Sequence, residues 1–397
     1  MNIKEISGGI YYVGVNDRTT QRFEGLWPLP YGVSYNSYII KSDKNVLVDT
    51  VEQSEAGLFI ENIEKVLGGK DLDYLVINHM EPDHSGSIVD IVNRYPNVKI
   101  VGNALTINMI KGFYRLENPN HYLAVKDGDT INIGDKTLKF IMTPMVHWPE
   151  TMMTYVCEPA IMFTGDAFGT FGALNGAVID HEMNTDVYFH EMYRYYSNIV
   201  GKYGVHVQKA LAKVAGIDIK MICPTHGPVW VEEIARVVEL TDKLSKGEAE
   251  DGVVIVYGTM YGNTARYAEI AAQRFAENGI KNIKVYNATF AEISDILADI
   301  FRYKGLVIGG PTYSANLFPP IEALLKALEV RELKNKALGV FGSYTWASSA
   351  TKLFHDYSLR LGLPLVSNVE IRQRGSEQNE EDIRMMADNI VHAIKLL

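Results

Sequence analysis

Four side chains that can bind a metal ion lie within six residues of the sequence: His79, Glu81, Asp83 and His84. They directly follow the apolar run Tyr74–Ile77, which predicts a strand, and precede a predicted helix. In such a loop, side chains spaced by two can turn inward together. A single histidine or aspartate here would most simply be a hydrogen-bonded structural residue, but four together favour a metal site.

Three further residues of the same kind stand in the same context. His147, Asp166 and His226 each follow an apolar run and lie in or beside a loop that contains Gly or Pro. Loops after strands are where α/β proteins build sites, so we expect all of them to lie along one sheet edge. Four histidines and three carboxylates are enough for two metal ions, with one carboxylate shared and positions open for a substrate.

A second kind of site is indicated in the C-terminal part of the chain, after residue 250. The loop Thr259–Thr264 follows the apolar strand Val253–Gly258 and precedes a helical run. Backbone N–H groups, the helix dipole and threonine hydroxyls can hold a terminal phosphate there. The loop lacks the G-x-G-x-x-G pattern and the lysine of a P-loop, which excludes a Rossmann dinucleotide site and a P-loop NTPase.

Two more loops follow later strands at the same expected edge of the sheet. They supply Tyr313, Tyr344 and Trp346 as candidate stacking planes for an isoalloxazine ring. The predicted cofactor-binding residues of the three loops are Thr259, Met260, Tyr261, Gly262, Asn263, Thr264, Pro311, Thr312, Tyr313, Ser314, Ala315, Asn316, Ser343, Tyr344, Thr345, Trp346 and Ala347.

The elements that must position these residues divide the chain in two. The polar stretch Ser245–Gly252 marks the boundary, which predicts domains at 1–249 and 250–397. In the second domain, strands alternate with amphipathic segments, which predicts a doubly wound parallel sheet of five strands. In the first domain the strands come in clusters separated by helical patterns, one of them at 186–214, and this indicates a mixed α/β layered fold.

Composition excludes several classes of function. The chain has 397 residues, with 38 basic and 48 acidic side chains and a net charge of −10, which argues against nucleic acid as a partner. No apolar run is long enough to span a membrane, and no export signal is evident, so we expect a cytoplasmic protein. Its two cysteines, Cys157 and Cys223, form no C-x-x-C motif and hence no rubredoxin-type centre.

The chain resembles the flavodiiron family in two respects. It has the H-x-E-x-D-H pattern followed by His147, Asp166 and His226, and a flavodoxin-like half follows this region in the sequence. This resemblance implies a metallo-β-lactamase-like αββα sandwich fused to a short-chain flavodoxin that binds FMN. It also implies His79, Glu81 and His147 on one iron, Asp83, His84 and His226 on the other, and Asp166 bridging. Zinc hydrolases of this fold usually have His where Glu81 stands, and the carboxylate favours iron.

The resemblance implies an oxidoreductase that reduces O2 to water, NO to N2O, or both. Tyr195 resembles a family position close to the metals, and Trp148 is a candidate to wall off the site from water. Electrons would come from an external donor: rubredoxin, another flavoprotein or reduced deazaflavin. A head-to-tail homodimer or a dimer of dimers is expected. Two alternatives stay open at this point: a zinc hydrolase fused to a flavodoxin, and a non-catalytic gas sensor or electron carrier.

Overall fold

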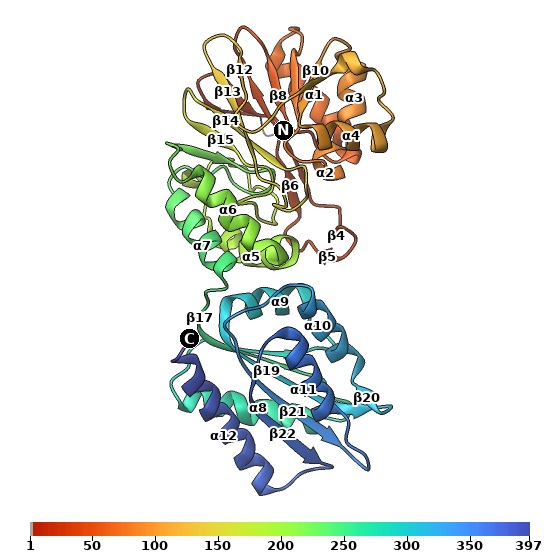
Figure 1. The fold of residues 1–397 in the computed structure, drawn as a ribbon, viewed down its shortest axis with the longest axis vertical. Helices are drawn as coiled ribbons and strands as arrows, with labels where there is room; N and C mark the ends of the chain where they lie inside the picture. Colours follow the sequence, from red (N-terminus) through yellow and green to blue (C-terminus); the bar gives the residue numbers. More distant parts are fainter. Residues whose placement is uncertain (1–2) are drawn as a thin grey trace. The chain divides into compact units, whose positions relative to one another are not determined.

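The computed structural model describes residues 3–397, and its chain forms two compact units (Figure 1). The first contains Met1–Tyr195 and Val205–Asp242, and the second contains Tyr196–Gly204 and Lys243–Leu397. None of the helices among the described residues combines the length and the apolar character that a membrane crossing requires.

Two sheets form the centre of the N-terminal unit, and both are mixed. The seven-stranded sheet has the order β1-β2-β7-β8-β9-β10-β11, and the five-stranded sheet has the order β12-β13-β14-β15-β16. The strands of the first are Lys4–Ser7, Ile10–Tyr12, Tyr38–Ile40, Val46–Val48, Tyr74–Val76, Lys99–Gly102 and Tyr122–Ala124. Those of the second are Thr130–Asn132, Thr137–Met142, Met152–Val156, Ile161–Phe163 and Met221–Cys223.

Helices surround these sheets in Figure 1. They are α1 (Ala56–Leu67), α2 (Pro82–Ser85), α3 (Ile88–Arg94), α4 (Ala104–Tyr114), α5 (Asp186–Tyr195), α6 (Gly204–Val214) and α7 (Ile234–Lys246). Two small ribbons, β3 (Val15–Asp17) with β6 (Val33–Tyr35) and β4 (Arg22–Phe23) with β5 (Trp27–Pro28), lie outside the sheets. The expected αββα sandwich is confirmed.

The helical run predicted at 186–214 is interrupted between α5 and α6. Tyr196–Val200 forms a π-helical turn and Gly201–Tyr203 a 3-10 turn. These turns group with the C-terminal unit, where the Asn198 side chain donates to Ser294 O and Arg331 Nε donates to Ser197 O. Tertiary contacts therefore override a local preference for one long helix.

The C-terminal unit is a parallel sheet of five strands in the order β18-β17-β19-β21-β22, with the short β20 antiparallel to β19. The strands are β17 (Glu250–Tyr257), β18 (Ile283–Asn287), β19 (Tyr303–Tyr313), β20 (Asn316–Leu317), β21 (Ala337–Tyr344) and β22 (Leu365–Arg372). The helices are α8 (Asn263–Glu277), α9 (Ile293–Arg302), α10 (Pro319–Glu329), α11 (Ala350–Leu361) and α12 (Glu377–Ile394). This order is that of flavodoxins, and the predicted doubly wound sheet is confirmed.

Candidate metal centre and flavin site

All seven predicted metal ligands come together in the N-terminal unit. His79 and Glu81 follow β9, and Asp83 and His84 lie in the short helix α2. His147 lies in the loop between β13 and β14, Asp166 follows β15, and His226 follows β16. The expectation of one sheet edge is wrong, because β9 belongs to the seven-stranded sheet and the other strands to the five-stranded sheet. The site lies where loops from both sheets meet.

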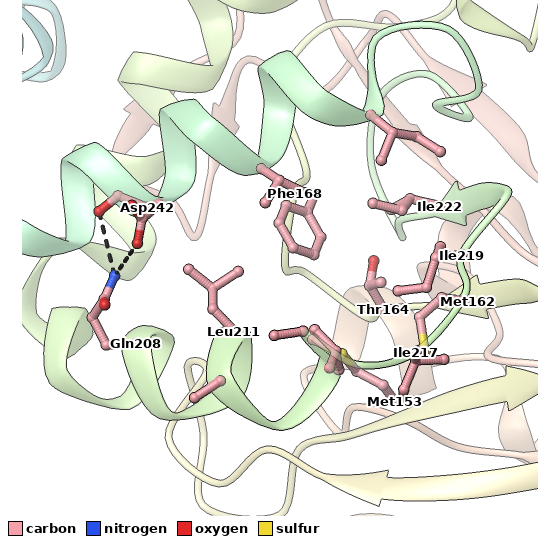
Figure 2. A pocket seen from close by; sticks show the side chains of 15 residues that line it. Met153, Met162, Thr164, Phe168, Gln208, Leu211, Ile217, Ile219, Ile222 and Asp242 are labelled. Carbon is pink, nitrogen blue, oxygen red and sulfur yellow. Dashed lines mark hydrogen bonds between the residues drawn. The ribbon is translucent and has the colours of Figure 1, made fainter.

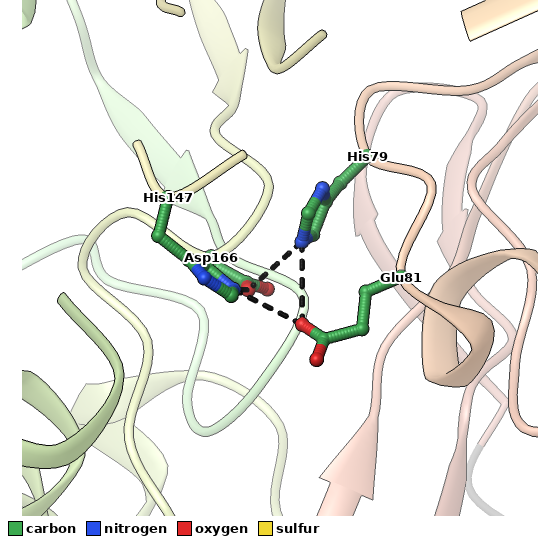
Figure 3. Close-up of side chains that lie close together, drawn as sticks. All are labelled: His79, Glu81, His147 and Asp166. Atoms are coloured by element: carbon green, nitrogen blue, oxygen red, sulfur yellow. Dashed lines mark hydrogen bonds and ion pairs between the residues drawn. The ribbon is translucent and has the colours of Figure 1, made fainter. Parts of the chain in front are cut away.

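The seven side chains form two groups, and each of them is at most 7% exposed. The first group contains His79, Glu81, His147 and Asp166, and Figure 3 shows these four side chains pointing toward one another. The second contains Asp83, His84 and His226. Within each group, one donor atom per residue lies within 4.8 Å of all the others. Spacing of this kind fits one metal ion per group.

Asp166 faces both groups at once. Its Oδ2 lies 3.1 Å from His147 Nε2 and 3.4 Å from His79 Nε2, as Figure 3 shows for the first group. Its Oδ1 lies 2.9 Å from His84 Nε2. One carboxylate therefore offers one oxygen to each group, which is the geometry of a bridging ligand.

Orphaned polar atoms test whether the residues fit a metal. Both oxygens of Asp83, both ring nitrogens of His84 and Nε2 of His226 are buried without a hydrogen bond among residues 3–397, although Nε2 of both histidines lies within 3.2 Å of Asp83 Oδ2. Buried polar groups without partners are costly, and a buried charge more so. A cation held by Asp83 and by Nε2 of His84 and of His226 would satisfy the atoms that face one another, and the donor set of imidazoles and carboxylates suits iron. The residues therefore fit the implied metal pair.

Mutual electrostatics keep the carboxylates ionised. Burial alone would lower the pKa of His84 and His147, but the neighbouring carboxylates outweigh it and raise each pKa to about 9. Burial would likewise raise the pKa of Glu81 and Asp166, but the facing histidines hold both well below the usual range. A metal ion therefore displaces imidazole protons when it binds, because the ligand form of histidine is neutral.

A network of buried hydrogen bonds fixes the loop that carries His79. Asn78 donates from its backbone to Asp49 Oδ1 at 2.7 Å and from its side chain to Asp49 Oδ2 at 3.0 Å. Thr154 Oγ1 donates to Asn78 Oδ1 at 2.6 Å. Burial raises the pKa of the Asp49 carboxyl to about 6, although these hydrogen bonds act against it. Sequence reasoning missed Asp49 because an isolated acid after a strand has no distinguishing spacing.

His226 is oriented from the other side of the site. Its Nδ1 lies 2.7 Å from the backbone oxygen of Ser34, which leaves Nε2 toward Asp83 at 3.1 Å. Thr225 Oγ1 donates to Asp166 Oδ1 at 2.6 Å. Gly227 follows with a φ of +78°, and a Cβ there would lie 2.3 Å from Thr170 Oγ1. The turn that presents His226 therefore requires glycine.

Tyr195, the first residue predicted next to the metals, is buried beside them. Its ring lies 5.6 Å from the His226 ring and 5.0 Å from Phe171. Burial and the nearby charge of Asp166 raise its pKa well above the usual value, so the phenol keeps its proton. Phe23 of β4 covers the same rings, 5.4 Å from His226. Sequence reasoning missed this hairpin because its strands are only two residues long.

Trp148, which was also predicted to lie beside the metals, is half-buried. Its ring meets His79 edge-on at 5.4 Å and His147 at 6.3 Å. Trp27 Nε1 donates at 2.9 Å to Oε2 of Glu24, whose carboxyl interacts with Glu81 of the first group. The Glu24 residue is exposed as a whole, but its carboxyl group is partly buried. This burial and the negative charge of Glu81 raise the pKa of Glu24 to about 7. Both tryptophans therefore stand at the margin of the first group.

A pocket of about 380 Å³ lies at the carboxyl edge of the C-terminal sheet. Ten of the predicted cofactor residues line it: Thr259, Met260, Tyr261, Asn263, Thr264, Pro311, Thr312, Ser343, Tyr344 and Thr345. Thr264 Oγ1 lies 3.2 Å from Ser343 Oγ at its base. The pocket has hydroxyls, backbone groups and aromatic rings, which suits a phosphate-bearing flavin.

The other seven predicted residues do not line this pocket: Gly262, Tyr313, Ser314, Ala315, Asn316, Trp346 and Ala347. Trp346 is 88% exposed, and Tyr313 packs edge-on against Phe318 at 6.1 Å. Gln373 and Arg374, which sequence reasoning missed, do line the pocket. They follow β22, so the rule that sites form at the carboxyl ends of parallel strands could have found them.

A second, apolar pocket of about 470 Å³ lies between α6, α7 and the five-stranded sheet (Figure 2). Among its lining residues, Gln208 Nε2 donates to Asp242 Oδ1 at 2.8 Å and Thr164 Oγ1 donates to Ala167 O at 2.7 Å. Apolar side chains such as Leu211, Phe168 and Ile222 make up most of the remaining wall. This pocket contains none of the seven predicted metal ligands.

Comparisons with known proteins agree with this geometry. Residues 33–227 match the family described as "ODP family beta lactamase", and residues 255–385 match "Flavodoxin". An "Anaerobic nitric oxide reductase flavorubredoxin" from Escherichia coli is 34% identical over 87% of this chain and 73% of its own length. The chain belongs to the flavodiiron family.

Other relatives of this flavodiiron protein extend the likeness over its whole length. An uncharacterized protein from Methanocaldococcus jannaschii is 35% identical and covers 95% of both chains. The "rubredoxin oxygen:oxidoreductase" of Desulfovibrio gigas superposes with a TM-score of 0.95 at 26% identity and covers 100% of this chain and 99% of the other. The flavodiiron protein of Giardia intestinalis gives 0.94 at 25% identity, covering 100% and 97%.

The resemblance inferred from the metal-ligand pattern is thereby confirmed, and so is the assignment as an oxidoreductase. The non-catalytic sensor and the zinc hydrolase are not favoured. A role within the family of NO and O2 reductases is supported.

Proposed function

We propose that this chain reduces O2 to water, NO to N2O, or both, at two iron ions that receive electrons from FMN. The observation that carries the proposal is Asp166, whose two oxygens face two separate groups of buried histidines and carboxylates. A second domain with a flavodoxin sheet and a pocket at its carboxyl edge supports it. The metal domain comprises residues 1–249 and the flavin domain residues 250–397.

The proposed ligands divide as the two groups do. His79, Glu81 and His147 hold one iron, Asp83, His84 and His226 hold the other, and Asp166 bridges them. Glu81 supports iron over zinc, because a hard carboxylate replaces an imidazole at this position. The names of two relatives support both gases, since one is a nitric oxide reductase and another a rubredoxin:oxygen oxidoreductase.

When bound, the FMN and the two irons can together supply the four electrons that one O2 requires. The side chains of this protein prepare the site for that chemistry. Tyr195 keeps a proton on its hydroxyl beside Asp166, because burial and that charge raise its pKa. Trp148 and Phe23 cover the histidines with aromatic surface and limit the entry of water. Apolar walls favour small uncharged gases over ions.

Partners and assembly belong to the same proposal. The proposed electron donor to the FMN is an external one: rubredoxin, another flavoprotein or reduced deazaflavin. A head-to-tail homodimer, or a dimer of dimers, would bring the flavin of one subunit near the irons of another. We expect the protein to work in the cytoplasm, where its two cysteines stay reduced.

The test begins with metal and flavin analysis of the purified chain. Two irons and one FMN per chain are expected, and zinc together with hydrolysis of a thioester or lactam would overturn the proposal. The protein is then reduced without oxygen and mixed with O2 or with NO, and the rates of both reactions are compared. A far higher rate with one gas assigns the substrate.

Two matched variants separate the two cofactors. Glu81→His is expected to lose iron and gas reduction while it keeps FMN. Thr264→Val is expected to keep both irons and to release FMN, measured as free flavin fluorescence. Full reductase activity in Glu81→His would contradict the ligand argument.

A further inference from the structure

A further buried carboxylate, that of Glu150, lies directly behind the first metal group, against His79. Its Oε1 lies 2.8 Å from His79 Nδ1 and accepts the backbone N–H of Met80 at 2.9 Å. Its side chain is 0% exposed. His79 Nε2 faces Glu81 and Asp166, so Nδ1 carries the proton and donates it to Glu150.

Glu150 also connects two of the loops that carry ligands. It belongs to the loop between β13 and β14, as His147 does, and it bonds to the loop after β9, which carries His79. The backbone oxygen of Glu150 accepts a hydrogen bond of 2.6 Å from Asn103 Nδ2, which fixes the position of the residue. The distance between two ligand loops therefore depends on one side chain.

This arrangement is costly to the folded chain. Oε2 of Glu150 is buried without a hydrogen-bond partner among residues 3–397. A buried carboxylate with a free oxygen destabilises a protein unless its charge is used. Hydrogen bonds from a ligating histidine to a carboxylate orient the ring and increase its basicity.

The second metal group lacks such a carboxylate on its two histidines. The Nδ1 atom of His226 faces the backbone oxygen of Ser34 at 2.7 Å, which is a neutral acceptor. The Nδ1 atom of His84 has no hydrogen-bond partner within the described part of the chain. The two positions therefore differ in the groups behind their ring nitrogens: Nδ1 of His79 faces a carboxylate, whereas Nδ1 of neither His84 nor His226 does.

We propose that Glu150 is a positioning residue for the first metal position and that its charge makes this position prefer the more oxidised ion. When the pair holds one Fe(II) and one Fe(III), the Fe(III) occupies the position of His79, Glu81 and His147. A more basic imidazole and a nearby negative charge both stabilise the higher charge of Fe(III). This inference rests on the proposed function, because it assumes that the site holds a redox-active pair.

Two substitutions separate charge from position. Glu150→Gln keeps an oxygen that can accept from His79 and Met80 but removes the negative charge. Glu150→Asp keeps the charge but withdraws it by one methylene group, so the hydrogen bond to His79 is lost. Thermal melting of both metal-loaded variants establishes that the domain remains folded.

The first measurement uses no turnover. Metal-depleted protein is titrated with Co(II), whose visible spectrum reports each binding event. In both variants, one of the two binding events is expected to weaken by about 10- to 100-fold, as for other residues that orient a metal ligand, while the other stays as in the wild type. Equal weakening of both events, or of neither, overturns the positioning role.

The second measurement is a redox titration of the iron-loaded protein, followed by the EPR signal of the mixed-valence pair. Removing the charge in Glu150→Gln raises the potential of the first iron, so the mixed-valence form exists over a narrower range of potential. A tenfold change in the preference for Fe(III) narrows this range by about 59 mV. Glu150→Asp keeps the charge but loses the hydrogen bond that makes the imidazole more basic, so it is expected to narrow this range less than Glu150→Gln does.

The outcomes distinguish the two claims. The assignment of Fe(III) to the first position is overturned if the potential range of the mixed-valence form is unchanged or wider in Glu150→Gln. It is also overturned if Glu150→Asp narrows this range as much as Glu150→Gln does. Failure of the wild-type protein to bind two ions refutes the proposed function itself. Binding of two ions by the wild type, with Glu150→Gln indistinguishable from it, refutes only the role of Glu150.

Discussion

Removal of the metal ions should make the stability of the N-terminal unit depend on pH in a direction that the site dictates. Without metal, neighbouring carboxylates raise the pKa of His84 and of His147 from 6.5 to about 9. Their protonation therefore stabilises the metal-free fold fully below pH 6.5, and this stabilisation is lost as the pH rises through 9. Each such rise in pKa corresponds to about 3 kcal/mol.

Other groups of the site do not cancel this effect. Glu81 and Asp166 have lowered pKa values, so they titrate only in acid, far below this range. In the metal-loaded protein both histidines are neutral ligands and carry no proton on Nε2, so the dependence should vanish. The quantity to measure is therefore the difference in the free energy of unfolding between the metal-loaded and the metal-free protein, as a function of pH.

Denaturant titrations of both forms at several pH values between about 6.5 and 9 would measure it, with tryptophan fluorescence as the signal. The substitution Trp346→Phe leaves Trp27, Trp148 and Trp230, all in the N-terminal unit. The free energy of unfolding of the metal-free form is expected to fall by at least about 3 kcal/mol over this range. A metal-free protein whose stability is constant, or rises, would refute the electrostatic account of the site.

Three further substitutions test other parts of the structure. Burial lowers the pKa of Lys336 from 10.5 to about 7, so the free energy of unfolding of the C-terminal unit should rise by up to about 4 kcal/mol as the pH increases between these values. Lys336→Met should abolish this rise, as measured by urea titrations at several pH values. Gly227→Ala forces a side chain into a left-handed turn against Thr170 and should cost about 1–3 kcal/mol and reduce metal content at the position of His226, measured by elemental analysis. Asp180 Oδ2 accepts the backbone N–H groups of residues 231–233 before α7, so Asp180→Ala should cost about 2–3 kcal/mol in thermal or denaturant unfolding, whereas Asp186→Ala at the exposed start of α5 should cost much less.

Elements and site residues could be predicted from the sequence where the local residue pattern agrees with the fold. Helix α11 spans Ala350–Leu361, one of the amphipathic segments that alternate with the strands of the second domain, because its apolar positions recur with the helical period and the flanking loops are polar. His79 to His84 could be recognised because four ligands in six residues have no common structural explanation. Both signals are local, so one sequence carries them.

Features that depend on tertiary contacts could not be read in this way. Glu150 and Asp49 are single acids whose importance appears only when His79 and Asn78 lie against them. The hairpin of β4 and β5 is too short to show an alternating pattern. Sequence order likewise gave no indication that β9 and β15 belong to different sheets, and so the shared sheet edge was wrongly expected.

The division of one aspartate between both groups has a consequence for assembly of the centre. An ion that enters the first group alone occupies Asp166 Oδ2 and leaves the carboxylate of Asp83 with only the ring nitrogens of His84 and His226, at 3.2 and 3.1 Å. The pKa of His84 is raised to about 9, so this imidazole carries a proton at neutral pH and must lose it before it can bind the next ion. Filling of the second group is therefore expected to release a proton and to gain affinity as the pH rises.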